Sequence, residues 1–419
     1  MAPISKVQEH KVSRLRGLRL PRRTLIHPLV IFWGAWIIAG VLYIVHLSDV
    51  LIFSGSIVID VVAWIVIPFT LAALVYLGFY SWAPSSLSAF RLDTEFRVAL
   101  LTRRLYIAFI IWAILTSVEI VVSGGVPLLW LIQGSSKSYF DFGIASFHGF
   151  LNSLILTIGL TGFAIFAMTG KKKHLWMPGF VVLWSLIAVT RNMMIVILIE
   201  CGIVWVMVRG ISSKTLSKGI FGLAALMLVF GYIGDVRTGV EQFQELAEPS
   251  SNYPNWLPSG VLWGYIYVST PLNNLINTTR SAHPLNSPLF PYTTSQLVPS
   301  ALRDKIYPQE IVGAAGGELV EESWNVSTAF VGAFQDFGML GIACYAMFMA
   351  LIAAHFWRDR SLRGSLVYAV VGQCLAISIF FNHLFYLPVI TQVVWLYVLL
   401  RQPRRSRPAV AGTNLSVKL

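Results

Sequence analysis

Apolar runs of about 20 residues recur along almost the whole chain, and short polar breaks separate them. Such a run matches the hydrocarbon core of a bilayer, about 30 Å thick, when it forms a helix that rises about 1.5 Å per residue. We therefore predict an all-α integral membrane protein with about ten transmembrane helices. They are expected at residues 28–47, 58–80, 105–123, 148–170, 175–190, 192–209, 219–235, 338–357, 364–382 and 384–400.

Two apolar runs are too long to be single helices. The run Leu175–Arg209 has 35 residues and as one helix would be about 50 Å long. Its only polar break is Thr190-Arg191-Asn192, so we expect a helical hairpin with its tip there. The same argument divides Gly364–Leu400 near Asn382-His383.

The composition agrees with this pattern. The chain has 419 residues, of which 56% are apolar and 12% are charged, whereas soluble domains carry about 25% charged residues. The three cysteines lie inside apolar runs and form no CxxC pair. Neither a disulfide framework nor a zinc site is therefore expected.

Lysine and arginine are unevenly distributed between the two sides of the predicted bundle. If both termini are cytoplasmic, 25 of the 31 basic residues fall in cytoplasmic segments and six remain outside. This split follows the usual excess of Lys and Arg in cytoplasmic loops, whereas the reverse orientation would break the rule at every short loop. The net charge of +12 thus reflects topology, and no nucleic-acid partner is expected because the charge is spread over short segments.

This topology divides the chain into five parts. They are a basic cytoplasmic N-terminus (1–27), transmembrane helices 1–7 (28–235), a large periplasmic loop (236–337), transmembrane helices 8–10 (338–400) and a basic cytoplasmic tail (401–419). Prolines break the loop into pieces, so we expect short helices and no sheet. Its segment Gly260–Thr279 is apolar and aromatic but ends in Asn and Thr. It fits either an amphipathic helix at the membrane surface or a re-entrant segment.

Several charged residues need an explanation. Arg191 lies at the predicted outer tip of the first hairpin, on the same side as Arg237 and Arg280. An Arg at a helix end can extend its charge to the membrane surface. Alternatively, its planar fork can bind phosphate oxygens, and we expect these three arginines to bind an anion. Glu119 and Glu200 lie within predicted spans, where an acid is either functional or a polar contact between helices.

Four stretches resemble oligosaccharide repeat-unit (O-antigen) polymerases of the Wzy type. The first is Gly124–Leu129, with the sequence FGIASFHG that follows its outer loop, and the second is Val189-Thr190-Arg191-Asn192. The others are Tyr265-Ile266-Tyr267 with Pro271-Leu272-Asn273-Asn274, and Asn325-Val326-Ser327-Thr328 with Phe334–Gly338 and Gly341. The resemblance covers most of Gly124 to Gly341 in order and spacing, and each motif alone is loose.

The resemblance implies a membrane glycosyltransferase at the outer face of a bacterial inner membrane. It would join oligosaccharide repeats carried on undecaprenyl diphosphate into a surface polysaccharide such as O-antigen, capsule or exopolysaccharide. The growing chain would move onto the incoming repeat and release undecaprenyl diphosphate. No cofactor or metal would be needed, because arginines would neutralise the diphosphate. Membrane lipids, a flippase and a chain-length regulator are the partners that this reading suggests.

Roles for the site residues follow from this reading. Asp336 and His383 are the favoured catalytic candidates, because both are expected at outer ends of spans. The alternatives are an acid at a helix N-terminus and a polar hairpin cap. The residues expected to bind substrate are Arg191, Arg237, Arg280, Asn325, Thr328 and Glu322.

Two other classes remain open. An O-antigen ligase uses a similar donor and commonly has an essential histidine in its outer loop. In the predicted outer loop of this chain, His283 is the only histidine. A lipid-linked oligosaccharide flippase or other transporter would have charges deep in several spans and short loops on both sides. The single large outer loop favours the enzyme.

Overall fold

The computed structural model is helical throughout the part of the chain that it describes. That part comprises residues 24–79, 95–212, 217–219, 221–222, 225, 240–254, 256–257, 259–313, 316–359 and 361–401. Within these ranges there is no β-strand, and β-type pairing is limited to an isolated bridge between Ser48 and Pro249. The expectation of an all-helical chain whose large loop has no sheet is confirmed for these residues.

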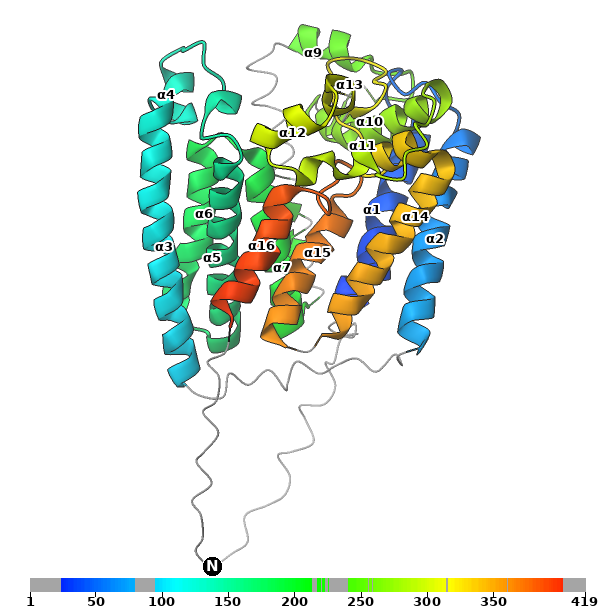
Figure 1. The fold of residues 1–419 in the computed structure, drawn as a ribbon. Helices are drawn as coiled ribbons and strands as arrows, with labels where there is room; N and C mark the ends of the chain where they lie inside the picture. Colours follow the sequence, from blue (N-terminus) through cyan, green and yellow to red (C-terminus); the bar gives the residue numbers. More distant parts are fainter. Residues whose placement is uncertain are drawn as a thin grey trace, which may run out of the picture.

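One set of helices forms a bundle, and a second set gathers at one end of it (Figure 1). The bundle helices are α1 (Pro28–Val45), α2 (Gly55–Phe79), α3 (Glu95–Ser123), α5 (Phe147–Thr169), α6 (Trp176–Ile187), α7 (Arg191–Arg209), α14 (Val331–Arg358), α15 (Leu362–Ala376) and α16 (Leu387–Leu399). The helices at its end are α4 (Pro127–Ile132), α9 (Val240–Ala247), α10 (Ser259–Ser281), α11 (Pro291–Thr294), α12 (Ser300–Ile306) and α13 (Gln309–Gly313). Short 3-10 turns are η1 (Thr24–Ile26), η3 (Tyr139–Asp141), η4 (Lys172–Leu175) and η5 (Ser295–Leu297).

Six helical stretches in the described ranges are long and apolar enough to cross a membrane. They comprise α1, α2, α5, α7, α14 and the stretch that contains α3 and α4. The chain is therefore a helical membrane protein. Helix α5 is central, since 78% of its apolar window is buried, against 28% for α1.

Both expected hairpins are present. Helices α6 and α7 divide the long apolar run at residues 188–190, and α15 and α16 divide the second run at residues 377–386. The helix breaks near Arg191 and near His383 are thus confirmed. Most of the span expected at 219–235 lies outside the described residues, so the number of ten spans remains a prediction.

Helix α14 begins earlier than expected and is kinked. It starts at Val331, and Phe337 and Gly338 leave the helical conformation, with φ = 59° and ψ = −148° at Gly338. Side chains other than hydrogen are strongly disfavoured at such dihedral angles, so glycine is required here. The expected start of the span, at residue 338, coincides with this kink.

The two ends of the bundle differ in structure. One end is covered by α9 to α13, and we call it the capped face (Figure 1). The opposite end, the basic face, holds the α5–α6 and α14–α15 connections and the end of α16. Basic residues at the basic face include Arg103, Arg104, Lys171, Lys172, Lys173, Arg209, Arg358, Arg363 and Arg401. The compartment that each face meets remains a prediction from charge.

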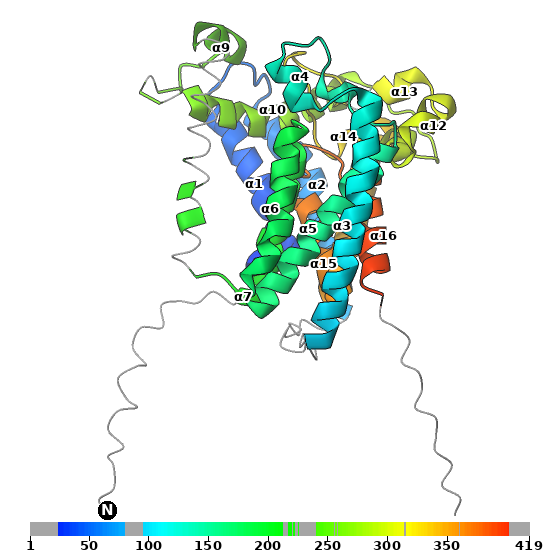
Figure 2. The ribbon, with the colours of Figure 1, turned by 90° about the vertical axis from the view of Figure 1, so that its left-hand side faces the viewer.

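Helix α10 lies along the capped face and does not descend into the bundle (Figure 2). It is mostly buried and packs on α1, α2, α9 and α14. Asn273 accepts hydrogen bonds from the Tyr43 hydroxyl (2.6 Å) and the Ile52 amide (3.3 Å) and donates to the Val50 carbonyl (2.9 Å). Asn274 donates to the carbonyls of Trp324 and Val326 and accepts from the Val320 amide. The asparagine-rich end of α10 therefore holds two loops on the bundle.

The kink of α14 requires a residue without a Cβ at Gly341, and this requirement can be tested. A Cβ at Gly341 would overlap the carbonyl oxygen of Ala333, and a backbone atom can yield only by moving the helix. We expect Gly341→Ala to destabilise the protein by about 1–3 kcal/mol, measured as thermal unfolding in detergent. Gly40 of α1 has open space around its Cα, so Gly40→Ala should be neutral or stabilising by about 0.5–1 kcal/mol. Equal unfolding temperatures for both variants would contradict this role of the kink.

Candidate functional site at the capped face

The α15–α16 connection, residues 377–386, is tied to the start of α14 and to α1. The Ala329 amide donates to the Ser378 carbonyl (2.8 Å), and the Trp36 indole donates to the Ser378 hydroxyl (2.9 Å). The Asn382 amide group donates to the Thr293 carbonyl of α11 (3.3 Å). The connection is thus a fixed platform under the capped face.

His383 lies inside this platform and is 2% exposed. Its Nδ1 lies 2.8 Å from Nε2 of Gln373, and its Nε2 lies 3.3 Å from Nδ2 of Asn192. Burial lowers the pKa of His383 to about 3, so the imidazole is neutral near pH 7. A neutral imidazole has one donor and one acceptor nitrogen, and an amide nitrogen only donates. One of the two amide nitrogens therefore donates to the acceptor nitrogen of the ring, and the other lies against the ring N–H. His383 thereby connects α15 to the first turn of α7.

Arg191 opens α7 next to Asn192, and its side chain is exposed. Its guanidinium makes no hydrogen bond or ion pair with any residue in the described part of the chain. The turn before it is strained, because Val189 has φ = 55°, and a β-branched residue in the left-handed region costs of order 1–3 kcal/mol. The fold therefore maintains an unfavourable turn that places an uncompensated cation at the end of two apolar helices.

A second arginine approaches the platform from the cap. Arg303 of α12 donates from Nη1 to Oε1 of Gln296 (2.6 Å). Burial raises the pKa of Tyr386, and the positive charge of Arg303 acts in the opposite direction. Arg303 therefore lies near the phenol that begins α16. From the sequence alone, Arg303 is one of the six basic residues expected outside. Its neighbour Tyr386 is far along the chain, so their proximity could not be predicted.

A histidine–carboxylate pair lies where α3 meets α5. Glu119 is 1% exposed, and its Oε2 lies 3.1 Å from Nδ1 of His148. The other oxygen accepts from the Ile144 amide (3.1 Å). Asn152 Nδ2 lies 2.8 Å from His148 Nε2, which fits Nδ1–H donating to Glu119 and Nε2 accepting. This arrangement orients the imidazole as a carboxylate orients a catalytic histidine.

Asp336 is buried at 0% exposure and fully engaged. Its two oxygens accept from the backbone amides of Tyr292 (3.0 Å) and Thr293 (2.8 Å), which are the unsatisfied donors at the start of α11. The carboxylate thus fastens α11 to α14 from the turn before the kink. This accounts for its burial without a catalytic role.

The remaining predicted binding residues do not meet in one place. Arg280 ends α10, is exposed, and lies over the Phe53 ring at 6.0 Å from its centroid. Glu322 and Asn325 are exposed, whereas Thr328 is buried and accepts from the Phe330 amide (3.2 Å). Arg237 lies outside the described residues.

Two further features bear on chemistry. Glu200 of α7 is buried, and Nε2 of Gln392 in α16 donates to its Oε2 (2.9 Å), so it forms a polar contact between helices. Among the described residues, no three His, Cys, Asp or Glu side chains group closely enough to hold a metal ion. The expectation of no metal remains a prediction.

Comparison with known proteins identifies no relative. No protein-family model, curated protein or solved structure matches the chain.

The role of Asp336 can be tested directly. Asp336→Asn leaves one backbone donor facing an amide N–H₂, and loss of a charged hydrogen bond costs about 1.5–3 kcal/mol. We expect the amides of residues 292–297 to exchange hydrogen about ten-fold faster or more, measured by mass spectrometry. Glu310→Gln, an exposed substitution in α13, is the control and should leave this exchange unchanged. Unaltered exchange in Asp336→Asn would contradict the fastening role.

Proposed function

We propose that this protein is a membrane glycosyltransferase that polymerises oligosaccharide repeats carried on undecaprenyl diphosphate. The proposed location is the outer face of a bacterial inner membrane, with the capped face in the periplasm. The observation that carries the proposal is Arg191, an exposed guanidinium without an acidic partner among the described residues, held by a strained turn at the end of two apolar helices. A lipid-linked diphosphate has the two properties that this position requires, an apolar tail and an anionic head.

Charge on the opposite ends of the helices also supports this proposal. The capped face keeps few basic residues, while the basic face has many. Retaining an unpaired arginine on the side that is otherwise poor in cations indicates selection for an anion. Arg forms paired, parallel hydrogen bonds with phosphate oxygens, and the diphosphate leaving group is the anion that the proposed reaction creates.

The proposed reaction transfers the growing chain. A hydroxyl at the non-reducing end of the incoming repeat attacks C1 of the sugar at the reducing end of the growing chain. The new glycosidic C–O bond forms while the bond from C1 to the diphosphate oxygen breaks, and undecaprenyl diphosphate leaves. Arg191 is assigned to the negative charge that develops on this diphosphate. Arg280 and Arg303 are further cations of the same face.

The hydroxyl proton needs an acceptor, and His148 is a better candidate than the two first favoured. Both oxygens of Asp336 are occupied by backbone amides, and His383 is 2% exposed with both ring nitrogens engaged. His148 is partly exposed, and the Glu119 carboxylate orients its ring. Its Nε2 accepts from Asn152, and a substrate hydroxyl would take the place of that amide. Helices α5 and α7 pack together and both begin at the capped face, so His148 and Arg191 occupy the first turns of neighbouring helices.

Polymer length on gels from cells that carry Arg191 variants tests the proposal. Arg191→Ala should reduce polymerisation by about 10²–10³-fold, as does the loss of a donor to developing charge. Arg191→Lys should also be impaired, because an ammonium cannot make the paired hydrogen bonds. Lys305→Gln removes another exposed cation of the same face and should keep wild-type ladders.

The same cells distinguish the alternative functions. Single-repeat glycolipid that accumulates at the outer face of the membrane in Arg191→Ala supports polymerase action. Accumulation at the inner face would instead identify a flippase, and full-length polymer that is not joined to lipid A core would identify a ligase. Wild-type ladders from Arg191→Ala at equal protein levels would refute the diphosphate role.

The role of His148 requires a second pair of variants. His148→Gln should lower polymerisation by about 10²–10⁴-fold, the usual contribution of a general base, while binding of the lipid-linked donor persists. Asn152→Ala frees Nε2 of the same imidazole and should retain activity, because the acceptor hydroxyl must take the place of Asn152. Equal losses in the two variants would indicate that the histidine only supports the fold.

A further inference from the structure

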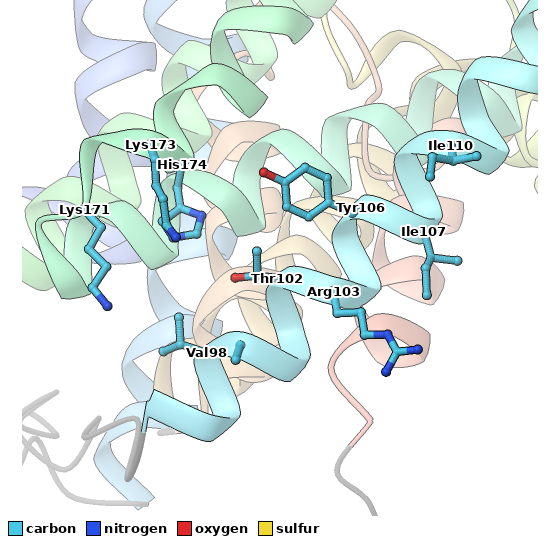
Figure 3. A pocket seen from close by; sticks show the side chains of 10 residues that line it. Val98, Thr102, Arg103, Tyr106, Ile107, Ile110, Lys171, Lys173 and His174 are labelled. Carbon is cyan, nitrogen blue, oxygen red and sulfur yellow. The ribbon is translucent and has the colours of Figure 1, made fainter.

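A hollow lies at the basic face between α3 and the α5–α6 connection, away from the capped face (Figure 3). Its volume is about 530 Å³. Ten residues line it: Val98, Ala99, Thr102, Arg103, Tyr106, Ile107, Ile110, Lys171, Lys173 and His174. The proposed transfer reaction uses none of them.

Two polar atoms beside this hollow are buried and have no hydrogen-bond partner among the described residues. His174 is 2% exposed, yet its Nε2 has no hydrogen-bond partner among the described residues, and neither has the buried Oγ1 of Thr102. The hydroxyl groups of Thr102 and Tyr106 point toward the same side of the hollow as His174 (Figure 3). Because both atoms are buried, the hydroxyl group open to a ligand in the hollow is that of Tyr106, whose side chain is 47% exposed.

The charged residues of the hollow are all cations. Arg103 comes from α3, and Lys171 and Lys173 come from the α5–α6 connection, so the cations lie on both sides of it. No Asp or Glu is among the ten lining residues, and all three cationic side chains are exposed. Three cations from two elements and the Tyr106 hydroxyl favour an anion that accepts several hydrogen bonds, which describes a phosphate group.

The wall of the hollow continues as an apolar surface. Ile107 and Ile110 are 49% and 56% exposed, and they follow Arg103 along α3 in the direction of the membrane interior. A free phosphate gains nothing from this surface, whereas an acyl chain gains roughly 0.8 kcal/mol for each buried CH₂ group.

We propose that this hollow is a binding site for the phosphate headgroup of an anionic phospholipid in the leaflet at the basic face. The phosphate lies between Arg103, Lys171 and Lys173 and accepts a hydrogen bond from Tyr106. The acyl chains follow Ile107 and Ile110 along α3. Basic pockets between membrane helices are a general means of binding anionic headgroups.

The chemistry of His174 fits this occupant. Burial lowers its pKa, and the neighbouring charges of Lys173 and Lys171 lower it further. The imidazole of His174 is therefore neutral near pH 7. A phosphate reduces the repulsion among the cations, so the ligand and the imidazole are compatible at neutral pH.

Native mass spectrometry of the full chain in neutral detergent tests the proposal. Phosphatidylglycerol, added in increasing amounts, should bind at low stoichiometry and at least about ten-fold more tightly than phosphatidylcholine, because a charged hydrogen bond contributes about 1.5–3 kcal/mol. Lys173→Gln and Arg103→Gln should each weaken phosphatidylglycerol binding about ten-fold.

Lys172 provides a matched control. It lies between two lining lysines and is exposed but does not line the hollow. Lys172→Gln removes the same charge from the same segment and should leave binding within about two-fold of wild type, since exposed charges are screened. Equal weakening in Lys172→Gln and Lys173→Gln would overturn the site in favour of general attraction to the basic face.

Two competitors identify the source of the phosphate. Millimolar inorganic phosphate or glycerol phosphate, neither of which has acyl chains, should not displace phosphatidylglycerol. Displacement by either would overturn the lipid assignment and indicate a soluble phosphate ligand. Equal retention of phosphatidylcholine and phosphatidylglycerol by the wild-type protein would refute an anion site altogether.

Discussion

Two asparagine side chains hold the capped face on the bundle. Asn273 makes hydrogen bonds with backbone groups of the loop between α1 and α2 and with the Tyr43 hydroxyl. Asn274 makes hydrogen bonds with backbone groups of the segment that leads from α13 to α14. Both side chains are almost completely buried, so each unmade hydrogen bond would leave a costly orphan group. An amide suits this task because it donates and accepts at once. With Asp336, which fastens α11, these contacts make the cap a rigid continuation of the membrane helices.

This rigidity explains why most polar residues near the capped face are already engaged. His383 joins two helices, Asp336 caps a helix, and Glu200 joins α7 to α16. Against this background Arg191 stands out, because it is exposed and has no partner among the described residues. His148 differs from the buried groups in being partly exposed, although Glu119 and Asn152 contact its two ring nitrogens. The division between structural and available polar groups carries the proposed function more strongly than any motif does.

Local physical rules predicted the helices but could not predict how distant polar residues pair. The division of Leu175–Arg209 follows from bilayer thickness alone, and α6 and α7 confirm it. The partners of Asn273 lie more than 200 residues away along the chain, so the residue type and the local sequence around Asn273 cannot predict them. The same limit hides the pairing of Glu119 with His148. Asp336 is a catalytic candidate from the sequence because it is expected at the outer end of a span. At that same position its carboxylate accepts from the first amides of α11 and caps that helix.

Two of the bundle helices, α6 and α16, are short, and this affects the lipid around them. Helices α6 and α16 have 12 and 13 residues, which gives lengths of about 18–20 Å, well below the hydrocarbon thickness of about 30 Å. Both expose large apolar side chains, such as Leu186 and Val394. A bilayer adapts to short helices by thinning. Around each of these two helices the lipid headgroups of the two leaflets are therefore expected to approach each other, and the membrane surface to lie closer to the turns that begin α7 and α16.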